Sequence, residues 1–107
     1  ASVYSGALRV RTDGVYSGYT TFDSTIRFGA GRLHSVVFSY SGVTAGDSLD
    51  VYNNTMASGF PILRLRANGT AGTIKHTFTN GVYCGTGIYV DFTTTGGFYE
   101  ASVEYSY

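Results

Sequence analysis

Apolar and polar residues alternate along the last third of the chain. Ile88, Val90 and Phe92 are separated by single residues, one of them charged, and from Tyr99 to Tyr107 every second residue is apolar or aromatic. A period of two is typical of antiparallel strands with one buried face, because successive side chains of a strand point to opposite faces of the sheet. The pattern predicts two strands in this part of the chain.

The same alternation predicts further strands upstream. One upstream segment, Tyr16 to Gly31, is less regular. Alternate residues in it still keep strand register: Phe22, Ser24, Ile26 and Phe28. No window has apolar residues at helical spacings of three and four, so we expect no substantial helix. The upstream strands are expected at about Val3–Arg11, Val36–Tyr40, Leu49–Val51, Leu63–Ala67 and Ile74–Phe78.

Turn residues separate these strands at intervals of about ten residues. The turns are expected at Asp13-Gly14, Ser41–Asp47, Asn68-Gly69-Thr70 and Asn80-Gly81. Such spacing favours an all-β fold, a single-domain antiparallel β-sandwich or jelly-roll of seven to eight short strands. We expect residues 1–107 to form this one domain, with residues 1–30 as a looser arm or edge strands.

Composition and charge exclude some partners. The chain has ten tyrosines, seven phenylalanines, fifteen glycines and one proline, which suits strands and tight turns. Seven basic and seven acidic residues are scattered along it, so the net charge is zero and no basic patch for nucleic acid is expected. No apolar run approaches the roughly 20 residues that cross a bilayer as a helix, so we expect no membrane partner.

The carboxylates do not form a recognisable catalytic or metal site. Glu100 and Glu104 share one face of a strand, but four residues at about 3.3 Å each place their backbones about 13 Å apart, too far for a glycosidase pair. Asp47 and Asp50 bracket a turn, yet the dense series of Asp and Asn that binds calcium is missing. We interpret these residues as parts of solvated strand faces and turns.

The residues that could act as nucleophile, base or metal ligand are few. Cys84 is the single cysteine, which excludes an internal disulfide, and we expect it to be a small buried side chain. His76 lies between Ile74 and Phe78, so it is expected on the inward face as a hydrogen-bonded residue at the edge of the core. Neither it nor His34 belongs to a catalytic or metal motif. We therefore predict no enzyme activity, no catalytic residues, no metal and no cofactor.

The remaining feature that could serve a function is the surface available for contacts with other molecules. The tyrosines are too many for so small a core, and exposed tyrosine is a common interface anchor. Arg9 with Arg11, and Arg64 with Arg66, project from strands two residues apart. They are suited either to carboxylates of a neighbouring subunit or to acidic residues of the same domain.

Three segments of the chain resemble a known group of proteins. The segments are Gly31–Phe38 (GRLHSVVF), Val51–Gly59 (VYNNTMASG) and Asn80–Asp91 (NGVYCGTGIYVD). They are similar to small all-β virion proteins of tailed bacteriophages, especially cyanophages, and the resemblance extends over about Gly31 to Tyr107. It implies a capsid decoration or cement protein, located in the virion and assembled in the host cytoplasm. It also implies the major capsid protein or other virion proteins as partners.

A decoration role predicts where the contacts lie. The segment from Ala1 to Gly31 is expected to add a strand to a neighbour, and closed oligomers are expected, with a trimer suited to a threefold axis. The residues expected at the interface are Val3, Tyr4, Leu8, Tyr16, Tyr19, Phe22, Arg9, Arg11, Arg64 and Arg66.

Two other functions remain open. A tail- or fibre-associated module would bind carbohydrate or a receptor by stacking tyrosines on sugar faces. A secreted filament subunit would use its N-terminal segment to complete the next subunit's sheet.

Overall fold

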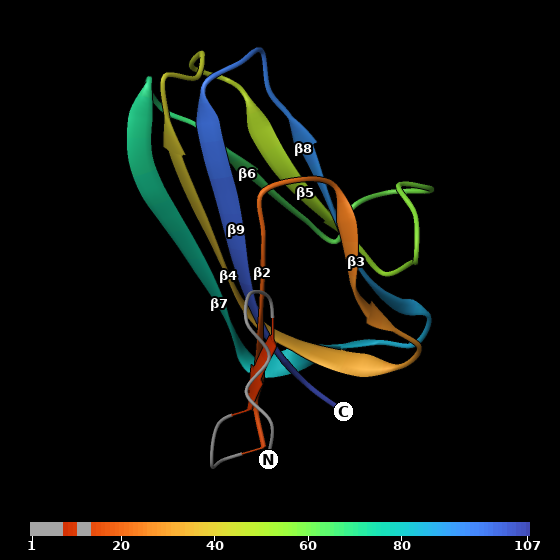
Figure 1. Ribbon diagram of the computed structural model, residues 1–107. Helices are drawn as coiled ribbons and strands as arrows, with labels where there is room; N and C mark the ends of the chain where they lie inside the picture. Colours follow the sequence, from red (N-terminus) through yellow and green to blue (C-terminus); the bar gives the residue numbers. More distant parts are fainter. Residues whose placement is uncertain (1–7, 11–13) are drawn as a thin grey trace.

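The computed structural model describes residues 8–10 and 14–107, which form strands, turns and loops (Figure 1). Within this part of the chain no helix is long and apolar enough to span a membrane. The strands are β1 (Leu8–Val10), β2 (Tyr16–Thr20), β3 (Ser24–Phe28), β4 (Gly31–Ser41), β5 (Ser48–Tyr52), β6 (Leu63–Arg66), β7 (Ala71–Cys84), β8 (Gly87–Thr93) and β9 (Phe98–Ser106).

Two antiparallel sheets pack face to face as a β-sandwich. One sheet has the order β1-β2-β9-β4-β7 and the other has the order β3-β8-β5-β6. From β2 to β9 the chain changes sheet at every connection except the one from β5 to β6. Two four-stranded sheets joined in this way form a jelly-roll, and β1 adds a fifth strand beside β2. The predicted all-β sandwich or jelly-roll is confirmed.

The strand count differs from the predicted seven to eight. The less regular segment contains two strands, β2 and β3, which lie in different sheets, so the described residues form nine strands. Phe22 was expected in strand register but lies in the connection between β2 and β3, because the chain crosses there from one sheet to the other. Of the predicted strand Val3–Arg11, only Leu8–Val10 is within the described residues. Two strands are also long, since β4 has 11 residues and β7 has 14.

The turn predicted at Asn80-Gly81 is wrong. Both residues have a positive φ, 65° and 73°, but β7 continues through them. Leu33 pairs with Val82 while Ser35 pairs with Thr77, so residues 78–81 of β7 lie opposite a single residue of β4. The positive φ angles produce a wide bulge that bends the strand without reversing it. The chain reverses instead between Cys84 and Gly87.

The core lies between the central strands of the two sheets. Phe38 and Val36 of β4 face it from one sheet, and Leu49, Val51 and Val90 face it from the other, all of them with no exposed surface. Along β4 and β9 buried residues largely alternate with less buried ones, as the period of two predicts. In β4 and β9 the face that the sequence predicts to be buried is therefore the buried one.

One predicted core-edge residue is exposed. His76 shares the inner face of β7 with Ile74 and Phe78, as expected, and its ring meets the edge of Phe78 at 4.6 Å between centroids. Its side chain is nevertheless exposed to solvent. The reason is position, because β7 is the last strand of its sheet, at the outer edge of the sandwich (Figure 1).

Candidate binding site

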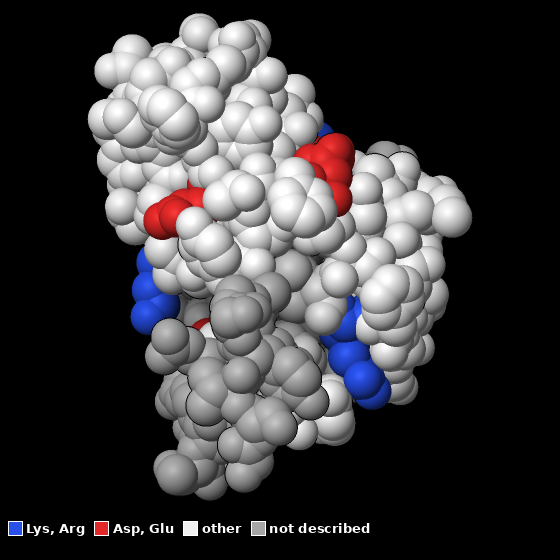
Figure 2. Space-filling model, viewed as in Figure 1, with Lys and Arg blue, Asp and Glu red and all other residues white. Residues whose placement is uncertain are grey.

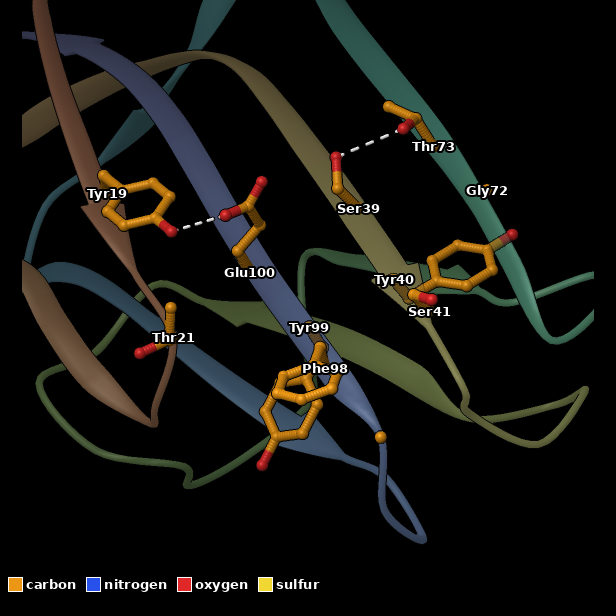
Figure 3. Close-up of a pocket in the computed structure, with 11 residues that line it drawn as sticks. Tyr19, Thr21, Ser39, Tyr40, Ser41, Gly72, Thr73, Phe98, Tyr99 and Glu100 are labelled. Carbon is orange, nitrogen blue, oxygen red and sulfur yellow. Dashed lines mark hydrogen bonds between the residues drawn. The ribbon is translucent and has the colours of Figure 1, made fainter.

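The outer face of the five-stranded sheet carries a shallow groove of about 670 Å³. It crosses β2, β9, β4 and β7, so residues far apart in the sequence line it together (Figure 3). Its size is within the range of about 300–1,000 Å³ that is common for small-molecule sites. The residues that matter most for its chemistry are Tyr19, Ser39, Ser41, Thr73, Phe98 and Glu100.

Strand register places a row of polar side chains across the groove. Ser39 of β4 lies opposite Glu100 of β9 on one side and opposite Thr73 of β7 on the other. These residues point away from the core because their neighbours Phe38 and Tyr40 point into it. Short hydroxyl side chains thus line the middle of the groove between longer ones.

Hydrogen bonds hold this row together. The Tyr19 hydroxyl donates to the Glu100 carboxylate, and the bond raises the pKa of Tyr19 above its ordinary value. The Ser39 and Thr73 hydroxyls lie 3.2 Å apart in an exposed hydrogen bond. In Figure 3 both bonds lie side by side on the same face of the sheet. The groove therefore presents one carboxylate and several hydroxyls in fixed positions.

The aromatic residues of the groove differ in exposure. Phe98 lies opposite Ser41 at the start of β9 and is 82% exposed, whereas Tyr19 at the other side is 41% exposed. Tyr99 packs against Phe92, with 4.8 Å between ring centroids. Phe98 therefore offers the most accessible apolar ring in the groove.

Two loops meet at the end of the groove beside Phe98. The Asp47 carboxylate accepts hydrogen bonds from the Thr44 and Thr95 backbone amides at 3.0 and 3.1 Å, which lowers its pKa. Gly97 packs so closely on Gly42 that a Cβ at Gly97 would lie 2.5 Å from the Gly42 carbonyl atoms. These contacts join the β4–β5 and β8–β9 loops and fix the backbone where Phe98 begins.

Carboxylates on the other sheet are also engaged within the molecule. Asp50 is only 3% exposed and receives two bonds from the Arg64 guanidinium, at 2.7 and 2.9 Å. Opposite Asp50 lies Asp91, whose pKa burial and the neighbouring Asp23 raise to about 6. Within residues 8–10 and 14–107, no group of three His, Cys, Asp or Glu side chains could hold a metal ion.

The residues predicted at the interface lie on several elements where the structure describes them. Val3, Tyr4 and Arg11 lie outside the described residues, and Leu8 and Arg9 belong to β1, at the edge beside β2. Phe22 is exposed in the β2–β3 connection, and Tyr19 lies in the groove. Tyr16 stacks on Tyr105 and Tyr107, with centroid distances of 5.5 and 4.6 Å. Their role in subunit contacts stays a prediction.

The two arginines predicted on β6 differ. Both side chains are exposed, but Arg64 pairs with Asp50 of the neighbouring strand, which is the intradomain alternative considered from the sequence. Arg66 lies two residues further along β6. Arg64 therefore already has a partner within the domain.

Cys84 is fully buried, as expected, and burial raises the pKa of its thiol.

Sequence reasoning missed most of the groove. Ser39 was read only as a residue of a strand and Glu100 only as part of a solvated face, while Thr73 and Phe98 lie just outside the predicted strands and were not singled out. A signal was present, since Ser39 and Ser41 of β4 and Thr73 and Thr77 of β7 occupy outward positions. That signal points to a site only once the strands are known to be neighbours.

The charges around the groove are sparse. Glu100 is the charged residue among the described residues that line it. Figure 2 shows mostly uncharged residues on the face in view, with a few small groups of acidic and basic side chains. Comparison of the chain with protein-family models, curated proteins and solved structures finds no match.

Proposed function

We propose that this protein is a structural subunit of a tailed-phage particle that decorates or cements the capsid by contact with other subunits. The observation that carries the proposal is the jelly-roll strand order, because viral capsid proteins and lectins both use this architecture. This support is an analogy at the level of the fold. The resemblance of residues 31–107 to phage virion proteins agrees with it.

The edges of the sandwich are suited to subunit contact. β7 has 14 residues and pairs along one side with β4, while its other side has no strand partner among the described residues. Long unpaired edges favour addition of a strand from another chain, since their backbone N–H and C=O groups are available. Repeated placement on a capsid would then make many modest interfaces hold firmly through effective concentration.

The proposal is tested by counting copies of this chain in purified particles by quantitative mass spectrometry, with the major capsid protein as internal reference. Several hundred copies per particle would support capsid decoration, whereas about a dozen or fewer would indicate a tail or fibre position. Absence of the chain from particles would contradict a virion role altogether. Light scattering of the purified protein measures its oligomeric state, for which we expect a trimer.

A second candidate function is favoured by a specific observation. The groove combines an exposed aromatic ring with several hydroxyls and a carboxylate, which is the composition expected of a carbohydrate-binding module. A tail or fibre module of this kind would attach to saccharides on the host surface. The filament alternative depends on the N-terminal segment, of which residues 1–7 and 11–13 lie outside the described part of the chain.

A further inference from the structure

We propose that the groove on the outer face of the five-stranded sheet is a binding site for a neutral saccharide. Phe98 would stack on the apolar face of a sugar ring, while Glu100, Ser39 and Thr73 would bond its hydroxyl groups. The inference goes beyond the capsid role and does not depend on it, because the groove is a property of one chain. It also assigns the site and ligand class that a carbohydrate-binding role would need.

The first argument is the exposed ring. Phe98 is 82% exposed at the head of β9, although an aromatic side chain gains free energy by leaving water. A sugar ring has a face of C–H groups that covers such a ring and leaves the hydroxyls free at its rim. Tyr19, across the groove, adds a second partly exposed ring that is held by its bond to Glu100.

The second argument is the polar row beside that ring. A carboxylate accepts hydrogen bonds only, whereas a hydroxyl both donates and accepts. Glu100, Ser39 and Thr73 stand side by side across three strands, so together they match the mixed donors and acceptors of a saccharide. Charge-assisted bonds from sugar hydroxyls to Glu100 would contribute most to affinity.

The third argument is charge. Among the described residues that line the groove, Glu100 is the charged one. An acidic saccharide would bring a second negative charge next to it, which is unfavourable. Lys75 lies on the same face of β7, two residues beyond Thr73 and opposite Val37, and it is not part of the lining. The groove therefore favours a neutral ligand.

The fourth argument is preorganisation. The polar row already has its hydrogen bonds, and the Asp47 and Gly97 contacts hold the loops beside Phe98. A site held in place before binding loses less conformational freedom when the ligand arrives.

The test uses the intact 107-residue chain. An array of neutral and acidic glycans is screened, and the best neutral hits are titrated while backbone amide signals are followed by NMR. We expect saturable binding to at least one neutral saccharide, with the largest shifts at Ser39, Thr73, Phe98 and Glu100. Phe98→Ala and Glu100→Gln should each weaken binding about tenfold, which corresponds to about 1.4 kcal/mol.

Matched controls separate binding from folding. Phe28→Ala removes another exposed phenylalanine, on β3, and Glu104→Gln changes a carboxylate four residues further along β9. Both should bind like the original chain. Failure of all neutral glycans to bind, preference for acidic glycans, or full binding by Phe98→Ala and Glu100→Gln would overturn the proposal. The capsid role has a separate readout, since copies per particle do not depend on glycan binding.

Discussion

At the scale of single residues, the carboxylates of this protein mostly serve its own structure. Asp47 ties two loops, Asp50 receives both bonds from Arg64, and Asp91 lies beside Asp23. Buried carboxylates need such partners because removing their charge from water is costly. From the sequence alone Asp47 and Asp50 were interpreted as residues that bracket a turn, since nothing local reveals the neighbour that each carboxylate meets.

Replacing Arg64 with methionine is expected to destabilise the fold. The substitution keeps much of the aliphatic stem but leaves the buried Asp50 carboxylate without its guanidinium. We expect the unfolding temperature to fall by on the order of 5 °C, measured by circular dichroism. Arg66→Met, two residues along the same strand at an exposed position, is the control and should have little effect. Equal losses in both variants would show that the Asp50 contact contributes little.

Asp91 should make stability depend on pH. Its pKa is raised from 3.8 to about 6, chiefly by burial and then by Asp23, so the folded state prefers the protonated form. The contribution of the protonated Asp91 carboxyl group to folding stability is fully present below about pH 4 and is lost as the pH rises through about 6. Because Asp91 is partly exposed, we expect the free energy of unfolding to fall by only on the order of 1–2 kcal/mol over this range.

The Asp91→Asn variant isolates this effect, because asparagine stays uncharged. We expect the variant and the original chain to have similar stability near pH 4, and the variant to be the more stable one above pH 6.5. Urea unfolding at both pH values measures the difference. If the free energies of unfolding of the variant and the original chain differed by the same amount at both pH values, the raised pKa of Asp91 would be contradicted.

At the scale of elements, the loops at one end of the sandwich decide how the groove is built. The β4–β5 and β8–β9 loops each connect strands of different sheets, and they meet through Asp47 and through the contact between Gly42 and Gly97. Gly97 has a φ of 78°, which L side chains rarely adopt, and no space for a Cβ. Here glycine is required by both the backbone conformation and the close approach of two chains.

Gly97→Ala should therefore destabilise the protein by about 1–3 kcal/mol, through strain and the clash with Gly42. Gly69→Ala is the control, since nothing lies within 4 Å of its added Cβ and its φ is not positive. We expect the control to stay within about 0.5 kcal/mol of the original chain in urea unfolding. An equal effect of the two substitutions would mean that the loop contact is looser than the structure indicates.

Element prediction succeeded where one face of a strand is fully buried. The alternation in β4, β8 and β9 was strong because these strands cover the core. It failed at Asn80-Gly81, where the sequence of a tight turn forms a bulge that β4 holds in the sheet. Local propensity sets positive φ angles, but pairing with a neighbouring strand decides whether the chain reverses.

At the scale of the whole molecule, the jelly-roll accommodates both proposed roles. Its sheet edges, β7 above all, are suited to contacts with other subunits, while the groove lies on an outer sheet face. The two proposed surfaces meet at β7, whose backbone edge would pair with another chain and whose Thr73 side chain lines the groove. Copy number in particles and glycan titration measure the roles separately.

The sequence by itself determined that the protein is all-β, where most strands lie and which side of them is buried. These properties follow from the period-two alternation, which depends only on neighbouring residues. The tertiary structure decided the pairing of strands and therefore the site. Tyr19, Ser39, Thr73 and Glu100 come from four strands and share one face because long-range register aligns them, and no local pattern encodes that register.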